Sequence, residues 1–345
     1  MTMYIRKLLR TTLAAAVLLL SATSLFAAGR SEQTAQRSIT LYSGRGESLV
    51  APLIEQFEAA SGILVNVRYG GTAELAVLLQ EEGDRSPADL YWGQDAGALG
   101  AVASAGLLQA LPDELFALLP PLYQSERGEW IATSGRARVL AYAPDLVEGF
   151  TFPDSIFDLV DRQYRGRVGW APTNGSFQSF VTAMRVRYGD GRTQEWVEGM
   201  IANDAQIYRN NTAIVEALGA GEIAMGITNN YYLLRFLADD PSFPVRQRFF
   251  ADGDIGNLVN VASIGILRTA EKRDGAVEFI RFLLDTAAQE YFTEMVYEYP
   301  VIDSVVPAGV LESFDRVIEV APEIDLDDLE DLEGTLNLLR RAGAL

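Results

Sequence analysis

Segments with the periodicity of strands and helices alternate along most of this 345-residue chain. Short apolar runs at 39–42, 63–69 and 88–92 are each followed by a segment in which leucines or alanines recur at helical spacing. Two more strand-like runs, at 167–172 and 223–228, are likewise followed by segments with helical spacing. This alternation predicts an open, mainly parallel α/β sheet flanked by helices, in which ligands bind at the carboxyl ends of the strands.

The length predicts two lobes rather than one. Domains of ordinary size contain about 100–200 residues, so 345 residues exceed a single domain. Two lobes imply a cleft between them, and a cleft is a common place for a ligand.

The first 28 residues have the pattern of a secretory signal peptide. Arg6, Lys7 and Arg10 precede a short apolar run, "LAAAVLLL", and small residues allow cleavage near Ala27 or Ala28. An uncleaved anchor is the alternative, but the apolar run is short and a polar stretch follows it. Without cysteine, we expect no anchor through a lipid-modified cysteine. We therefore expect a mature protein in the periplasm, released by cleavage.

The chain contains neither cysteine nor histidine. This excludes disulfides, thiolate catalysis and cysteine-ligated metal sites, and it removes the commonest general base and metal ligand. A metal site in this chain has to use oxygen ligands. The formal net charge of −19 disfavours binding to nucleic acid.

Two adjacent tyrosines follow a predicted strand in "ITNNYYLLRF". Asn229 and Asn230 occupy the turn, and Tyr231 and Tyr232 fall in the first turn of the next helix. A helix amino terminus favours negative oxygen, and phenolate is a strong ligand for a hard, highly charged cation such as ferric iron. The alternative for any such pair is a role as core aromatics with satisfied hydroxyl groups.

Several motifs occur in order between residues 39 and 303. Besides "NNYY", these are "LYSGR", "SPADLYWGQDAGAL", "SGRARVLAY", "GWAPTNGSF", "YRNNTAIVEAL" and "EYP". Together they resemble the periplasmic ferric-ion-binding proteins of bacterial iron ABC transporters. The resemblance implies a two-lobe periplasmic-binding-protein-like fold with hinge strands. It also implies capture of Fe³⁺ with a synergistic anion, and delivery to a membrane permease by a monomeric protein that is not an enzyme.

The resemblance also implies lobe boundaries and metal ligands. Lobe 1 would comprise residues 38–138 and 258–310, and lobe 2 residues 139–257 and 311–345. Three tyrosines match family ligands and would hold the iron: Tyr142, Tyr231 and Tyr232.

This chain departs from the family pattern at two ligand positions. Many relatives have a histidine and a glutamate where this sequence has Gly46 and Gln94. The remaining positions on the ion would be filled by an anion such as carbonate, by water, or by Tyr42 or Asp95. Iron could arrive as the free ion or as a small chelate.

The anion would be held by donors at several turns. Arg45 offers a planar fork to a bidentate oxyanion. By resemblance, the turn Asn174, Gly175 and Ser176 and the helix cap at Asn211 contact the anion. Arg138 and Asn229 are further candidates. For Asn211 the alternative is helix capping alone, and for Arg138 it is bracing of the lobe crossover.

Two other functions stay open at this point. The cleft could bind an organic ligand or oxyanion, for example a phosphonate or a polyamine, with the tyrosines stacking on it. A secreted hydrolase could use paired carboxylates such as Asp95 and Glu47, which need no histidine. Iron phenolate absorbs visible light, so colour on addition of Fe³⁺ separates the first alternative from iron binding.

Overall fold

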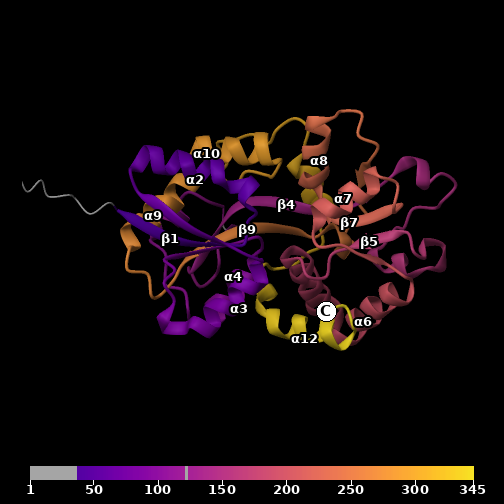
Figure 1. The fold of residues 1–345 in the computed structure, drawn as a ribbon, viewed down its shortest axis with the longest axis horizontal. Helices are drawn as coiled ribbons and strands as arrows, with labels where there is room; N and C mark the ends of the chain where they lie inside the picture. Colours follow the sequence, from indigo (N-terminus) through magenta and orange to yellow (C-terminus); the bar gives the residue numbers. More distant parts are fainter. Residues whose placement is uncertain (1–36, 121–122) are drawn as a thin grey trace, which may run out of the picture. The chain divides into compact units, whose positions relative to one another are not determined.

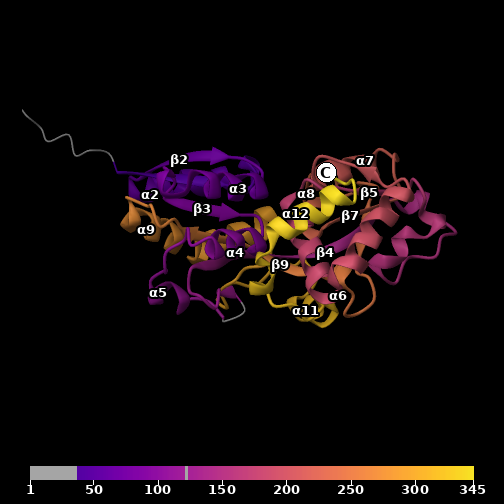
Figure 2. The ribbon, with the colours of Figure 1, turned by 90° about the horizontal axis from the view of Figure 1, so that it is seen from below.

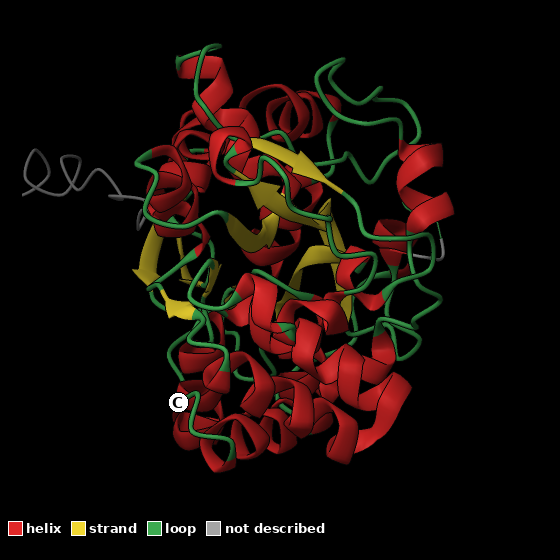
Figure 3. Ribbon diagram, turned by 90° about the vertical axis from the view of Figure 1, so that its right-hand side faces the viewer, coloured by secondary structure: helices red, strands yellow, loops and turns green. Residues whose placement is uncertain are grey.

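The computed structural model describes residues 37–120 and 123–345. The predicted signal peptide, residues 1–28, lies outside the described residues. In the described part the strands gather at the centre and helices cover them (Figures 1 and 3). The α/β class expected from the sequence is confirmed.

The described residues form a nine-stranded sheet, in which eight strands follow the order β2-β1-β3-β9-β4-β7-β5-β6 and the ninth, β8, pairs with β4. The strands are β1 Ser38–Ser43, β2 Leu64–Tyr69, β3 Leu90–Gly93, β4 Trp130–Tyr142, β5 Val168–Trp170, β6 Gln206–Ile207, β7 Met225–Asn229, β8 Arg246–Arg248 and β9 Val259–Ile266.

The direction of pairing differs between the outer strands and the two long ones. β1 pairs in parallel with β2 and β3, and β5 pairs in parallel with β6 and β7, as the alternating pattern predicted. β4 and β9 instead run antiparallel to each other and to their other partners. The expectation of a mainly parallel sheet therefore holds only for the outer groups of strands.

Strand β4 changes partner along its length. Its first part, Trp130–Ala137, pairs with β9, and its last part, Arg138–Tyr142, pairs with β7. A single strand thus joins the group that contains β1 to the group that contains β5. Its buried arginines, Arg136 and Arg138, lie on either side of the change.

The helices pack on both groups of strands (Figures 1 and 2). The α-helices are α2 Glu47–Ser61, α3 Thr72–Glu82, α4 Ala96–Ser104, α5 Asp113–Phe116, α6 Gly175–Ala202, α7 Asn211–Gly219, α8 Asn230–Asp239, α9 Arg273–Leu283, α10 Thr286–Tyr291, α11 Phe314–Val320 and α12 Leu332–Arg341. Helix α12 packs on α6 and also contacts α4.

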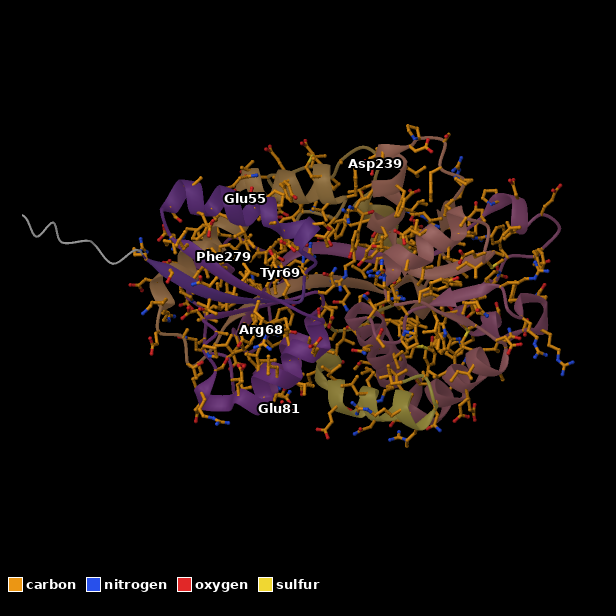
Figure 4. The ribbon with its side chains drawn as sticks, in the orientation of Figure 1. Glu55, Arg68, Tyr69, Glu81, Asp239 and Phe279 are labelled. Atoms are coloured by element: carbon orange, nitrogen blue, oxygen red, sulfur yellow. The ribbon has the colours of Figure 1, made fainter. Side chains whose placement is uncertain are left out.

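Apolar burial follows the predicted helical spacing. Phe279 of α9 is fully buried and lies edge-on to Phe57 of α2 and to Trp92 of β3. Glu55 of α2 and Glu81 of α3 lie on the faces of their helices that are turned away from the core, and both are exposed (Figure 4). Leu329 and Leu332 in the acidic stretch near the carboxyl end are also buried, so the acidic residues there form the solvated face.

Candidate metal and anion site

The tyrosine pair lies where the sequence placed it, at the start of α8. Asn229, at the end of β7, has extended backbone angles and precedes the first helical residue. The side chain of Asn230 accepts a hydrogen bond from the Ala137 backbone at 3.0 Å, which fixes the beginning of α8 on β4. The rings of Tyr231 and Tyr232 stack, with centroids 4.1 Å apart and planes 29° apart.

Tyr231 is buried, and its hydroxyl oxygen accepts a hydrogen bond from Gln94 Nε2 at 2.7 Å. Burial, followed by the neighbouring Tyr232 and Glu298, raises the pKa of Tyr231 well above its ordinary value of 10.0, while Arg45 acts in the opposite direction. Tyr231 therefore stays protonated at neutral pH unless a cation is bound beside it.

Arg45 is buried against Trp92 and Phe292, with its guanidinium 5.6 and 5.8 Å from the ring centroids. Its Nη1 and Nη2 donate to the two carboxylate oxygens of Glu298 at 3.0 and 2.8 Å. Glu298 accepts a further bond from Ser134 Oγ at 2.5 Å. The terminal nitrogens expected to bind an anion are thus already paired, so Arg45 is not a free anion donor in this structure.

Two more arginines lie buried close by. Neither terminal nitrogen of Arg136 has a hydrogen-bond partner among the described residues. Arg138 donates from Nη1 to the Ser176 carbonyl at 3.1 Å and lies over the ring of Phe180 at 4.6 Å. Burial, and then the charge of Arg136, lowers the pKa of Arg138 to about 9. The buried guanidinium groups of these two arginines therefore place positive charge near the tyrosine pair.

Asp95 is a second buried carboxylate of this region, besides Glu298. Its Oδ1 caps α4 by accepting from the Ala98 backbone at 2.9 Å, while Oδ2 has no partner among the described residues. Burial raises the pKa of Asp95 to about 6, against the attraction of Arg136. Within the described residues no group of three or more Asp, Glu, His or Cys side chains could hold a metal ion. Phenolic oxygen and oxygens from a bound anion are the alternative donors.

The expected anion donors come together from three elements. Ser176, in the first turn of α6, donates from Oγ to Asn174 Oδ1 at 2.7 Å. The same Oγ accepts from Asn229 Nδ2 at 3.2 Å and from Asn211 Nδ2 at 3.5 Å. Asn211 Oδ1 is buried without a partner among the described residues. The turn before α6, the start of α7 and the end of β7 thus present polar groups to one place.

A cleft of about 350 Å³ opens beside these groups. It is lined by the turn after β1, the start of α3, Gln94, Tyr232 and the turn that contains Gly175. A Cβ at Gly175 would lie 2.9 Å from Thr72 Cβ and 3.2 Å from Asp95 Oδ2. The amino end of α6 therefore packs against α3 with no space for a side chain.

Two of the predicted ligand residues, Tyr142 and Tyr42, do not lie beside the tyrosine pair of α8. Tyr142 pairs with Met225, at the end of β7 opposite to Asn229, and its ring packs edge-on to Phe152 at 4.8 Å. Four residues of strand separate the two ends by about 13 Å. Tyr42 donates its hydroxyl hydrogen to Glu82 at 3.0 Å. Tyr142 is therefore remote from the pair and the Tyr42 hydroxyl is engaged by Glu82, so we do not retain either residue in the ligand set.

Sequence reasoning missed Glu298 as the partner of Arg45. The two residues are 253 positions apart, and no local pattern connects them. It also missed Arg209 and Arg235, which line the cleft. The spacing could have indicated Arg235, because it lies one helical turn after Tyr231.

The sequence profile of the family described as bacterial extracellular solute-binding protein matches residues 42–290. The chain belongs to this family. This solute-binding protein is 28% identical over 311 residues to the major ferric iron-binding protein of Neisseria meningitidis serogroup B, covering 88% of this chain and 92% of the relative. It is 33% identical over 282 residues to iron uptake protein A1 of a Synechocystis strain, covering 78% and 77%.

A solved structure of an iron-bound protein is also similar to this chain. Iron-bound HitA from Pseudomonas aeruginosa is 32% identical to this solute-binding protein and superposes with a TM-score of 0.84, covering 89% of this chain and 99% of HitA. The resemblance to periplasmic ferric-ion-binding proteins that the motifs indicated is confirmed. No helix in the described residues combines the length and apolar character of a membrane span.

Proposed function

We propose that this solute-binding protein captures Fe³⁺ with a synergistic anion and delivers it to an ABC permease. The observation that carries the proposal is the stacked pair Tyr231 and Tyr232 at the start of α8, with Tyr232 on the cleft. The two phenols offer adjacent oxygen ligands in a region without a cluster of carboxylates among the described residues. The relatives named above are ferric-binding and iron uptake proteins, which supports the choice of ion.

Tyr231 and Tyr232 would supply two ligands, and the anion would supply others. The groups around Ser176, Asn211 and Asn229 would hold the anion through neutral donors. Gln94 donates a hydrogen bond to Tyr231, so it supports the phenolate from the position where many relatives have a glutamate ligand. Arg45 favours the same charged form of Tyr231, while burial, Tyr232 and Glu298 oppose it until a cation is bound.

The cellular setting follows from the signal-peptide pattern and the family. We propose cleavage after residues 1–28, residence in the periplasm as a monomer, and closure of two lobes over the ion. The change of partner on β4 between Ala137 and Arg138 lies beside the proposed boundary at 138. The permease would then receive iron from a hinged carrier.

An absorption spectrum tests the function. Addition of Fe³⁺ to the purified protein at neutral pH is expected to give an intense visible charge-transfer band. Because Tyr231 must lose a proton whose pKa is raised, and tyrosine in general is protonated below about pH 10, binding to two phenols releases about two protons. Iron affinity should therefore fall by about two orders of magnitude for each unit of decrease in pH. A protein that stays colourless, or whose iron affinity does not change between pH 8 and pH 6, contradicts the proposal.

Gly175→Ala tests whether the contact between α6 and α3 is needed for binding. The added methyl group would lie 2.9 Å from Thr72 Cβ, and such overpacking costs about 1–3 kcal/mol. We expect about a tenfold loss of iron affinity, measured by competition with a chelator. Gly191→Ala, in the same helix with open space around it, is the matched control and should bind as the wild type does. Equal affinity in both variants would show that this contact is not required.

The two alternatives can be judged by the same structure. A phosphonate or another oxyanion would use the donors near Ser176 without the tyrosine oxygens, and it would produce no colour with iron. The hydrolase hypothesis has less support, because Asp95 is buried as the cap of α4 while Glu47 is exposed on α2.

A further inference from the structure

The carboxy-terminal segment crosses from one group of strands to the other. Residues 325–341, here called the strap, comprise the short 3₁₀ turn η8 (Asp327–Glu330) and helix α12. The turn η8 packs on α4, which contacts β3 and β9, and α12 packs on α6, which follows β5. In Figures 1 and 2, α12 runs from the α4 side of the molecule to the α6 side. The strap therefore joins the same two groups of strands as β4 does, and none of its residues is among the described residues that line the cleft.

Two adjacent residues of the strap are held by arginines from the two groups. Glu330 accepts from Arg127 Nη2 at 2.9 Å and from the hydroxyl of Ser104, at the end of α4. Asp331 accepts from Nη2 of Arg185, a residue of α6, at 2.8 Å, and its backbone carbonyl accepts from Nη1 at 3.1 Å. Because one peptide unit, about 3.8 Å long, separates the two anchors, α4 and α6 cannot move apart here unless one anchor is released.

The anchor on α6 is the stronger of the two. Thr335 of α12 and Thr182 of α6 share a buried hydrogen bond at 2.7 Å, and Thr335 also accepts from Arg185 at 3.1 Å. The Arg185 side chain is only 12% exposed, whereas the side chains of Arg127 and Glu330 are 53% and 39% exposed. Exposed ion pairs contribute little to stability, while buried hydrogen-bonding groups are costly to separate. The anchor on α4 is thus the one that parts first.

The contact between the strap and α4 depends on two glycines of that helix. A Cβ at Gly97 would lie 2.6 Å from the carbonyl oxygen of Leu329, and a Cβ at Gly100 would lie 2.9 Å from Glu330 Cβ. The Leu329 side chain is fully buried. The turn η8 therefore lies directly against the backbone of α4. Close-packed contacts of this kind are either made or broken rather than stretched.

We propose that the strap restrains the opening of the cleft: it stays on α6 and must release α4 before the two groups of strands separate. The strap then governs the rate at which iron enters and leaves, although it does not touch the ion. This inference rests on the closure of two lobes in the proposed function. It gives the contact between η8 and α4 a role in the timing of binding rather than in the ligand set.

A disulfide tests the contact with α4, and the chain has no cysteine of its own to interfere. The Cβ positions at residues 100 and 330 have to move apart by only about 1 Å to reach the spacing of a disulfide. The mature variant Gly100→Cys/Glu330→Cys is loaded with Fe³⁺ and then oxidised, and iron loss to excess EDTA is followed through the visible band. We expect loss to be more than about tenfold slower than in either single variant, because the cross-link prevents opening.

Thr182→Cys/Thr335→Cys is the matched control for the cross-link. It places a disulfide between the strap and α6, and iron loss should equal that of the wild type because this anchor stays closed during opening. Equal rates in the two oxidised double variants would overturn the role of the strap.

Glu330→Gln tests the same anchor without a cross-link. It should speed iron loss by about two- to fivefold, the change that loss of an exposed ion pair supplies. Glu319→Gln makes the same substitution in an exposed pair on α11, outside the strap, and should leave the rate unchanged. Equal rates in these two variants contradict the proposal even if the disulfide does not form.

Small-angle X-ray scattering of the iron-free proteins separates the strap from the iron site. The wild type is expected to have a larger radius of gyration than oxidised Gly100→Cys/Glu330→Cys, because only the wild type can open. Equal radii overturn the strap alone. If the wild type binds no iron, the proposed function is wrong, and the comparison of radii still decides whether the strap restrains opening.

Discussion

Tyr231→Phe and Tyr232→Phe are each expected to lower iron affinity by more than about 100-fold and to weaken the visible band. Each change removes one oxygen and leaves the stacked ring, whose centroid is 4.1 Å from that of its neighbour. Loss of a group that only orients a metal ligand costs about 10–100-fold, and loss of the ligand itself should cost more. Competition titration with a ferric chelator gives the affinity, and the spectrum at saturating iron gives the band.

Two further variants make this result specific. Tyr188→Phe removes the hydroxyl of a half-buried tyrosine that packs on Phe157 and does not line the cleft, so it should be without effect. Tyr142→Phe should also leave affinity within about twofold, because Tyr142 lies at the other end of β7. A loss in Tyr142→Phe equal to that in the pair would mean that this tyrosine reaches the ion after all.

Glu298→Gln is expected to destabilise the fold by about 3–5 kcal/mol. The substitution keeps the shape of the side chain but leaves Arg45 as an unpaired charge, fully buried between Trp92 and Phe292. Removing one partner of a buried ion pair typically has a cost of this size. Urea unfolding followed by circular dichroism measures the change, and the free energy of unfolding should fall while the slope with urea stays constant.

The control for this stability change removes one charge from an ion pair that is exposed to solvent. Asp204 pairs with Arg165 at 2.7 Å, and both side chains are more than half exposed. Asp204→Asn should change stability by less than about 1 kcal/mol. The double variant Arg45→Met/Glu298→Leu should recover much of the stability lost in Glu298→Gln, because no buried charge is left without a partner. If Glu298→Gln is as stable as Asp204→Asn, the buried pair contributes little.

Local patterns predicted the part of the site that is formed by neighbours in sequence. The helix start and the adjacent phenols of "NNYY" lie within one short segment, and the structure has them as predicted, although Asn229 ends β7 and Asn230 begins α8 with no separate turn between them. The turn with Ser176 and the start of α7 follow the same local rules, but the predicted cap at Asn211 was wrong by one residue, because Asn210 caps α7 by accepting from the Ala213 backbone. Their convergence on one place could be expected because the ends of neighbouring strands meet at one edge of a sheet.

Contacts between distant segments could not be predicted in this way. Tyr142 ends a strand that the sequence identified, but only the antiparallel register with β7 shows that its position is remote from Tyr231. Arg45 follows a turn, as an anion donor would, but its acceptor is Glu298 of the "EYP" motif, and nothing in that motif indicated the pairing. Pairing registers and partners of buried charges depend on the whole fold.

The position of β9 has a consequence for how the protein is made. This strand lies between β3 and β4 in the sheet, although more than a hundred residues separate it from both in the chain. Until residue 266 has been synthesised, β3 and β4 each lack a neighbour and keep an unpaired edge. Completion of the sheet is thus postponed until most of the chain has been synthesised.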